Sequence, residues 1–362
     1  MMTNITGFRG VGYSFNPLDS YLSLPLDEMN EKTIKIYLKK NPYNFSSILM
    51  PGQNINPLDI INKFISNKIF KIDERDSIYF YEQEFEYGNK RYLRKGYLGT
   101  ILIDTKKIFP HEKIFEELKI NRLNMLLKTG YDLEPIFLIY KNDGKKCFSE
   151  EKIDLISWGK DPIGVLNRLY STEMKYIECD NINFVIADGH HRFEAAKEFS
   201  KIEKRARRIM AVFIDLNQDS LFILPSHKLV KNIKINIKDF ENYFEIEQIT
   251  GLKESDKNHI VMNLNEKFFK LKFKEKYQFP LITLFEKIIM KKILKREIDL
   301  ENVKTFHNTK FEINSKNSAI FYFPPPSPTE VYEFSLKGGI MPQKSTYFFP
   351  KISSGIKIYK KY

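Results

Sequence analysis

The sequence of 362 residues contains only two cysteines, Cys147 and Cys179, which lie far apart in the chain. They form no CxxC pair, which excludes a disulfide framework and a cysteine-ligated zinc site and is typical of a reducing compartment. The sequence also lacks a run of about 18 apolar residues, which a membrane-spanning helix requires. Its N-terminal residues lack the apolar segment of a signal peptide. We therefore expect a cytoplasmic protein that does not cross a membrane.

The sequence also has no internal repeat, no low-complexity segment and no G-x-x-x-x-G-K-[ST] motif. The absence of that motif excludes a phosphate-binding loop of the Walker A type. Hydrophobic residues make up 42% and charged residues 29%, which is the balance of a globular protein rather than a disordered one. The length is sufficient for two or three folded units.

Positive charge is in excess, because 58 Lys and Arg residues face 46 Asp and Glu residues and give a formal charge of +12. Such a protein attracts anions such as nucleotides, nucleic acids or acidic membrane surfaces. The positive residues are spread along the chain, and only Lys201–Arg208 is a dense cluster. Most basic runs are solvated helix faces. The composition therefore favours an anionic ligand, with nucleic-acid binding through this cluster as the weaker interpretation.

The spacing of apolar residues predicts an α/β fold of the mixed α+β kind. We expect helices at Glu31–Lys40, Pro57–Phe70, Lys113–Thr129 and Phe193–Ile202. We expect strands at Ser77–Glu86, Arg91–Asp104, Glu134–Tyr140, Ile182–Ala187 and Ile209–Leu216. Gly130 is expected to close the third helix in a left-handed conformation. After residue 232 we expect further α and β elements, including a helix at Pro280–Lys295.

The most informative segment is Asp188-Gly189-His190-His191-Arg192, between an apolar strand and a helix. Glycine allows a sharp turn and the close approach of a ligand, and the N-terminus of a helix attracts an anion. An arginine can bind two phosphate oxygens at once, and two imidazoles add further donors. Asp188 is suited to hold a metal or to hydrogen-bond a hydroxyl. The alternative is an Asp188 helix cap with two surface histidines and a solvated arginine. We favour a phosphate-binding active site.

Three further segments are candidates for the same site. Glu112 comes just before a helix and is either a general base or a capping acid, and the local sequence favours capping. His227 follows a buried strand and a turn, and it is a candidate to line the same cleft. Lys344-Ser345-Thr346 combines a cation with two hydroxyls, a common way to hold phosphate, although by itself such a triplet is more often a turn. His259 and His307 are expected to be surface residues.

The chain resembles an uncharacterised family of bacterial and archaeal proteins of about this size. Two motifs are the most specific, the ADGHHR core at 187–192 and the C-terminal MPxKSTYFxPK segment at 341–351. The other matches are distributed along the chain, at Asn41–Asn44, Ile78–Gln83, Arg94–Gly96, Pro110–Glu112, Arg122, Pro135–Phe137, Glu194–Ala196, Leu224–His227 and Gly355.

This family is similar to the ParB/sulfiredoxin-like fold, which includes free serine kinases. The resemblance implies a core at 96–230 with the order strand, carboxylate-bearing turn, helix, Pro-Ile strand and Gly-x-x-Arg turn. It also implies an N-terminal α/β unit at 1–95 and a C-terminal α+β unit at 231–362 that returns to the cleft. Glu112 then corresponds to the catalytic carboxylate of the kinases, while Asp188 and residues 190–192 meet the nucleotide phosphates.

The sequence departs from this pattern in three places. A Pro-Pro-Tyr-Asp element is replaced by Leu24-Pro25-Leu26-Asp27, and an expected His-Arg pair reads His227-Lys228. A point charge thus stands where a forked cation is expected. The stretch between Tyr140 and Gly189 is longer than in the compact kinases. These departures concern the identity of the substrate more than the binding of phosphate.

Together, the central motif and the resemblance predict a phosphotransferase that moves phosphate from ATP or ADP to a small hydroxyl substrate such as free L-serine. Catalysis is assigned to Glu112 and Asp188, with a magnesium ion at Asp188. Phosphate binding is assigned to Gly189, His190, His191, Arg192, His227, Lys344, Ser345 and Thr346. The main alternative is a nucleotide-binding switch or adaptor without kinase activity. A nucleic-acid-binding protein is the third interpretation.

Overall fold

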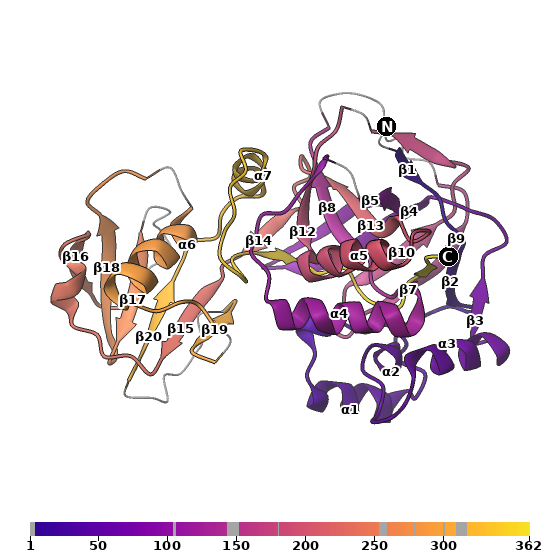
Figure 1. The fold of residues 1–362 in the computed structure, drawn as a ribbon, viewed down its shortest axis with the longest axis horizontal. Helices are drawn as coiled ribbons and strands as arrows, with labels where there is room; N and C mark the ends of the chain where they lie inside the picture. Colours follow the sequence, from indigo (N-terminus) through magenta and orange to yellow (C-terminus); the bar gives the residue numbers. More distant parts are fainter. Residues whose placement is uncertain are drawn as a thin grey trace. The chain divides into compact units, whose positions relative to one another are not determined.

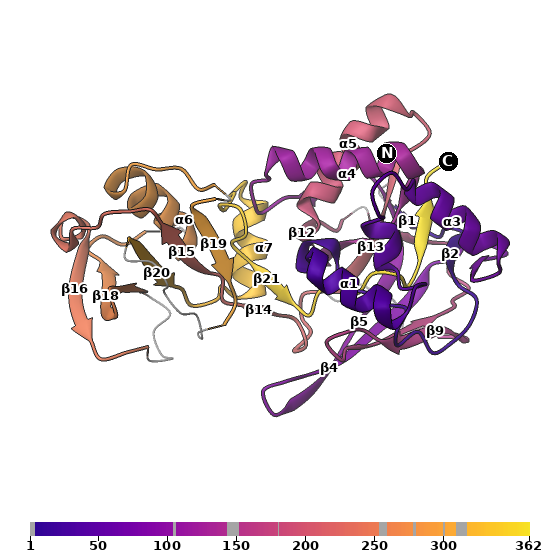
Figure 2. The ribbon, with the colours of Figure 1, turned by 90° about the horizontal axis from the view of Figure 1, so that it is seen from below.

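A computed structural model describes residues 4–103, 106–142, 152–179, 181–252, 259–277, 280–299, 301–308 and 317–362. The chain divides into two compact units (Figures 1 and 2). Unit 1 consists of Met1–Pro110, Ile114–Leu221 and Pro350–Tyr362, and unit 2 consists of His111–Lys113 and Phe222–Phe349. Both units are therefore discontinuous in sequence. The division into three units at 95 and 230 stays a prediction.

The main sheet of unit 1 carries the central motif. Its strands are β1 (Asn4–Thr6), β4 (Tyr79–Tyr87), β5 (Lys90–Leu102), β6 (Ile108–Phe109), β8 (Ile136–Tyr140), β9 (Leu155–Lys160), β10 (Leu166–Tyr170), β11 (Tyr176–Glu178), β12 (Phe184–Asp188) and β13 (Arg208–Asp215). They form a ten-stranded sheet in the order β6-β12-β8-β13-β5-β4-β10-β9, with β1 pairing with both β5 and β11. Because β12 and β8 are antiparallel, with Asp188 opposite Phe137, the end of β12 lies beside the start of β8.

A second, four-stranded sheet ties the end of the chain into unit 1. Its strands are β2 (Gly10–Tyr13), β3 (Phe70–Ile72), β7 (Tyr131–Asp132) and β22 (Ile358–Lys360), in the order β3-β2-β22-β7. The C-terminal strand β22 thus lies between two strands from the first 132 residues of the chain.

Unit 1 contains the four helices expected from the sequence, three of them displaced at one end, and one short helix that was not expected. They are α1 (Glu31–Lys40), α2 (Ser46–Leu49), α3 (Pro57–Ser66), α4 (Glu116–Thr129) and α5 (His190–Ile202), with a 3-10 turn η1 (Leu26–Glu28). The helix expected to reach Phe70 ends at Ser66, because Phe70 belongs to β3. Gly130 adopts the expected left-handed conformation, with φ +70°. Helices α4 and α5 lie side by side (Figures 1 and 2).

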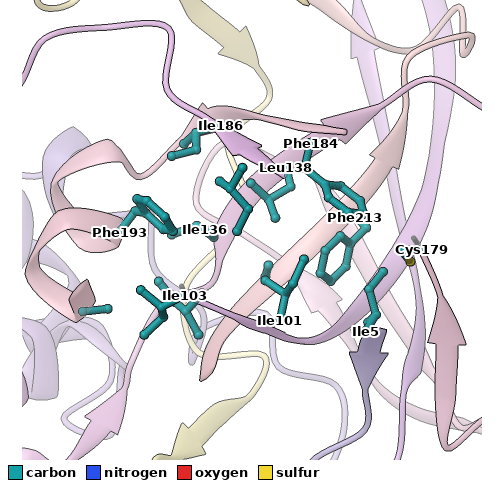
Figure 3. Close-up of a cluster of buried hydrophobic side chains, with 14 of the residues drawn as sticks. Ile5, Ile101, Ile103, Ile136, Leu138, Cys179, Phe184, Ile186, Phe193 and Phe213 are labelled. Carbon is teal, nitrogen blue, oxygen red and sulfur yellow. The ribbon is translucent and has the colours of Figure 1, made fainter. Parts of the chain in front are cut away.

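The core of unit 1 lies between the main sheet and α5. Figure 3 shows Phe193 of α5 facing Ile136 of β8, with Leu138 of the same strand and Phe184 and Phe213 of neighbouring strands beyond it. Ala195 and Ala196 of this helix are fully buried. Strands β8 and β12 read as continuous apolar runs because both of their faces are covered.

Unit 2 contains a six-stranded antiparallel sheet. Its strands are β15 (His227–Lys231), β16 (Phe244–Ile249), β17 (Ile260–Leu264), β18 (Lys267–Phe273), β19 (Val303–Phe306) and β20 (Ser318–Tyr322). A separate two-stranded sheet consists of β14 (Phe222–Leu224) and β21 (Tyr347–Phe349). The larger sheet has the order β16-β18-β17-β20-β15-β19, and β14 pairs with β21. Its helices are η2 (Ile237–Phe240), α6 (Leu281–Leu284), the π-helix η3 (Phe285–Ile293) and α7 (Pro328–Leu336).

The mixed α/β class expected from the sequence is confirmed by these sheets and helices. The order β5, Pro110–Glu112, α4, β8 and Gly189–Arg192 agrees with the order implied by the resemblance. Within the described residues, no helix is long and apolar enough to cross a membrane. Cys179 is buried, and Cys147 lies outside the described residues.

Candidate functional site

The turn after β12 is built on Gly189, which has φ +93° and forms the N-cap of α5. A Cβ atom added there would lie 2.9 Å from Cγ2 of Ile136, so the position requires glycine both for its conformation and for its space. No side chain caps the helix. The first N–H groups of a helix have no acceptor within it and carry partial positive charge. The alternative of an Asp188 helix cap is therefore wrong.

Asp188 and Arg192 form an ion pair beside this turn. Nη2 of Arg192 lies 2.5 Å from Oδ2 of Asp188, and its Nη1 donates to the carbonyl oxygen of Pro135 at 2.5 Å. The other carboxylate oxygen of Asp188 pairs with Nζ of Lys351. Burial alone would raise the pKa of Asp188, but Lys351 and Arg192 outweigh it, and the pKa is lowered. Nε of Arg192 is buried with no hydrogen-bond partner among the described residues.

The two histidines of the turn are not solvated surface residues. His190 is buried, and His191 is half-buried with its ring parallel to that of Phe115. Nε2 of His191 accepts a hydrogen bond of 3.0 Å from the backbone N–H of Phe115, which precedes α4. When neutral, this imidazole therefore carries its proton on Nδ1. Arg192 is also mostly buried, so the alternative of exposed histidines and a solvated arginine is wrong.

A second group of charges lies in unit 1 around Arg122 of α4. The guanidinium contacts Asp27 at 2.5 Å and Glu134 at 3.2 Å. Glu134 also accepts hydrogen bonds from the hydroxyl of Ser354 and the N–H of Leu26. Burial alone would lower the pKa of Arg122, but the two carboxylates, with Asp188 adding to them, raise it. Arg122 therefore holds the carboxylate of Asp27 in a defined position. The residues before Asp27 depart from the Pro-Pro-Tyr element expected from the resemblance.

Glu112 belongs to unit 2, where it holds the segment 344–346. Its Oε1 accepts hydrogen bonds from the N–H and the hydroxyl of Thr346, at 2.7 and 2.8 Å. Its Oε2 accepts one from the N–H of Lys344, whose φ of +55° turns that N–H inward. Nε2 of His111 lies 2.7 Å from the same hydroxyl. Since the hydroxyl gives its one proton to an ionised Glu112, His111 is the donor to Thr346.

The local sequence favoured a capping role for Glu112, and this expectation is wrong. Helix α4 begins at Glu116 with Phe115 as its N-cap, and no side chain caps it. The carboxylate instead binds a backbone turn more than 230 residues further along the chain. Sequence gave no local signal for this contact.

Lys228 also binds the Lys344–Thr346 turn. Only 1% of it is exposed, and its Nζ donates to the hydroxyl of Thr305 at 2.8 Å and to the carbonyl oxygen of Lys344 at 2.6 Å. Burial lowers its pKa to about 7, with Glu112 opposing that change and Lys344 adding to it. The hydroxyl of Ser345 donates to the carbonyl oxygen of Pro342. Much of the Lys344–Thr346 turn is thus engaged inside unit 2.

His227 is a core residue of unit 2. Its Nδ1 accepts a hydrogen bond from the N–H of Phe323 at 3.1 Å, and its ring lies edge-on to Phe306 and Tyr322. Burial, with His307 nearby, lowers its pKa to about 4, so the imidazole is neutral. The expectation that His259 and His307 are surface residues is wrong, because His259 is buried and His307 is half-buried.

The comparison with protein families decides which family the chain belongs to. Residues 5–300 match the family described as a protein of unknown function, DUF1015. The chain belongs to DUF1015. This confirms the expected membership of an uncharacterised family. No curated protein matches the chain.

Solved structures with similarity to this DUF1015 chain include two named proteins and a hypothetical one. SbnI with a C-terminal truncation from Staphylococcus aureus is 12% identical, with a TM-score of 0.46, and the match covers 73% of this chain and 87% of that chain. A mutant free serine kinase in complex with ADP is 16% identical, with a TM-score of 0.43 and coverage of 71% and 91%. A conserved hypothetical protein from Pyrococcus furiosus is 14% identical, with a TM-score of 0.41 and coverage of 72% and 95%.

A magnesium ion was expected at Asp188. In this arrangement both oxygens of the carboxylate are paired with cations, which leaves no place for a divalent cation unless those cations move. Among the described residues, no group of three or more His, Cys, Asp or Glu side chains is placed to hold a metal. No chemical step is therefore assigned to a metal in this DUF1015 protein.

Three residues of unit 1 that lie near the Asp188–Arg192 turn received no role from the sequence. Lys351, Arg122 and Asp27 were noted within motifs but were given no role. The signal available was their presence in motifs that carry the resemblance. Glu112, His227 and Lys344–Thr346 lie in unit 2, while the central motif lies in unit 1.

Proposed function

We propose that this protein is a phosphotransferase that moves a phosphoryl group from a nucleotide to a small hydroxyl substrate, with free L-serine as the first acceptor to test. The observation that carries this proposal is the uncapped N-terminus of α5 at Gly189, with the Arg192 guanidinium beside it. Backbone N–H groups, a helix dipole and an arginine are the groups that proteins use to hold phosphate oxygens.

Phosphoryl transfer needs an aligned donor, neutralised charge and a base near the accepting hydroxyl. The N–H groups after Gly189, together with Arg192, would hold the donor phosphates. Asp188 would orient the hydroxyl once its cations turn to the phosphate. Glu112 is assigned as the proton acceptor from the resemblance to the serine kinases. No measured distance enters this assignment.

Nucleotide binding is tested first by thermal shift with ATP, ADP and AMP, each with and without magnesium. A ligand that binds the folded state raises the melting temperature. The Arg192→Ala variant should lose that rise, because it removes a mostly buried cation at the turn. Arg205→Ala is the matched control, because Arg205 is an exposed arginine of the same unit that pairs with Glu203. An equal rise in both variants would count against the phosphate site.

Catalysis is tested with the Glu112→Gln variant. It should keep the nucleotide-induced rise in melting temperature and lose turnover by a factor on the order of 100. Turnover is measured as phosphorylated acceptor formed from L-serine and other hydroxyl compounds. Unchanged turnover in a folded variant would remove Glu112 from the mechanism.

A nucleotide-binding switch without transfer is the second candidate. It is favoured by the engagement of both proposed catalytic carboxylates, Glu112 by three hydrogen bonds and Asp188 by two cations. Stable nucleotide binding with no phosphorylated product from any hydroxyl amino acid would support it. The nucleic-acid interpretation is weakened because Lys201 and Arg205 of the basic cluster pair with Glu198 and Glu203.

A further inference from the structure

Lys351 reaches the Gly189 turn from a segment that is neither helix nor strand. It belongs to the last part of the chain, Pro350–Tyr362, which returns to unit 1 after unit 2. Its side chain is only 12% exposed, and its ammonium group pairs with the Asp188 carboxylate. Irregular backbone is seldom buried, because its polar groups need partners. Two buried side chains supply these hydrogen-bond partners to the backbone at residues 350 and 351.

Gln83 and Arg94 fix the backbone on which Lys351 stands. Nε2 of Gln83 donates to the carbonyl oxygen of Lys351 at 3.0 Å, and Nη2 of Arg94 donates to that of Pro350 at 2.5 Å. Gln83 is fully buried and Arg94 is 1% exposed, and the two side chains also bond to each other. Burial lowers the pKa of Arg94 to about 10. Burying a guanidinium is costly, and its result is a defined position for residues 350 and 351.

The charges at the turn leave two cations on one carboxylate. Asp188, Arg192 and Lys351 together carry a net charge of +1, and the α5 N-terminus adds partial positive charge. The neighbouring group of Asp27, Arg122 and Glu134 carries −1. The six side chains are therefore neutral together, with the positive part at the turn. One cation suffices to neutralise Asp188 itself, and the second leaves local positive charge at the turn.

We infer that Lys351 contacts the donor phosphate of the proposed nucleotide site, that Gln83 and Arg94 position it, and that Asp188 holds its ammonium group until the phosphate replaces the carboxylate. This inference rests on the proposed function. Two cations at one turn favour the larger negative charge of a di- or triphosphate over that of a monophosphate. The site therefore selects nucleoside di- and triphosphates over monophosphates.

The test compares Lys351→Met with Lys357→Met in the full chain. Lys357 is a buried lysine of the same segment that pairs with Asp73 at 2.7 Å, away from the turn. Titration calorimetry with ADP, AMP and inorganic pyrophosphate measures affinity, and the melting temperature without ligand reports folding. Lys351→Met should weaken ADP and pyrophosphate on the order of 10-fold or more, and AMP less. Lys357→Met should lower the melting temperature and leave the ADP affinity unchanged.

Two further variants keep the inference testable should Lys351→Met not fold. Lys351→Arg keeps the charge and should bind ADP more tightly than Lys351→Gln, which does not. Gln83→Met removes one anchor of residue 351 and should weaken ADP more than AMP. Wild-type affinity for ADP in folded Lys351→Gln would overturn the role of Lys351 and leave the proposed function standing. Absence of nucleotide binding in the wild-type protein would overturn both.

Discussion

At the scale of the residue, Lys228 shows how a buried charge is tolerated. Its ammonium group has three oxygen acceptors, the hydroxyl of Thr305 and the carbonyl groups of Gln343 and Lys344. These replace water only in part, because burial still lowers its pKa to about 7. An arginine, expected here from the resemblance, would stay charged at any accessible pH. Unit 2 therefore contains a buried lysine whose protonation changes near pH 7.

We predict that Lys228 makes stability depend on pH between about 7 and 10.5. In that range the unfolded chain binds a proton that the folded chain does not, so the unfolding free energy rises with pH by up to about 1.4 kcal/mol per unit. Below pH 7 the cost of the buried charge is fully present. Lys228→Met should lose this slope in urea unfolding at pH 6, 8 and 10. Lys272→Met, at an exposed position, is the control and should keep it. An unchanged slope in Lys228→Met would contradict the assignment.

Contacts between residues that are close in sequence can be predicted from the sequence, and contacts between distant residues cannot. Asp188 and Arg192 are four residues apart, so a helix start at Gly189 already places them together. Lys351 is 163 residues from Asp188, and Glu112 is 232 residues from Lys344. Periodicity and turn signals are local, and they carry no information on such contacts.

At the scale of the element, the strand-turn-helix unit was predicted with its ends displaced. The strand runs on to Asp188 and the helix begins at His190, because left-handed Gly189 turns the chain from one into the other in a single residue. Helix α7 was not predicted, although Ser327, Pro328 and Glu330 form a capping box with proline in the first turn. The π-helical form of η3 has no sequence signal of this kind.

We predict that Gly189→Ala destabilises unit 1 more than Gly130→Ala. Both glycines are left-handed, with φ +93° and +70°, and alanine costs about 1 kcal/mol in that conformation. At Gly189 the added Cβ would also lie 2.9 Å from Ile136, while at Gly130 its nearest neighbour, in Tyr362, is at 3.3 Å. Unfolding midpoints in urea at equal slopes measure both variants. Equal losses of stability in the two variants would show that the turn at Gly189 relaxes to accommodate the added Cβ atom.

At the scale of the whole molecule, the chain order does not follow the folded units. Unit 1 contains the C-terminal strand β22 between β2 and β7. Pairing between strands that lie more than 200 residues apart is set by long-range packing, which composition and periodicity do not encode. The resemblance implied that the C-terminal unit returns to the cleft, and this stays a prediction.

We predict that a chain ending at Phe349 loses the folded state of unit 1 although it retains most of that unit. The missing segment buries Ile352, Ile356 and Ile358, and burial of three such side chains contributes about 5–9 kcal/mol. This is comparable with the whole stability of a domain, about 5–15 kcal/mol. Hydrogen exchange should show lost protection in β2 and β7, while the six-stranded sheet of unit 2 stays protected and serves as the internal control. Protection of β2 and β7 equal to that in the full chain would mean that the segment is attached to a unit already stable, and Lys351 would then be removable from the turn without unfolding it.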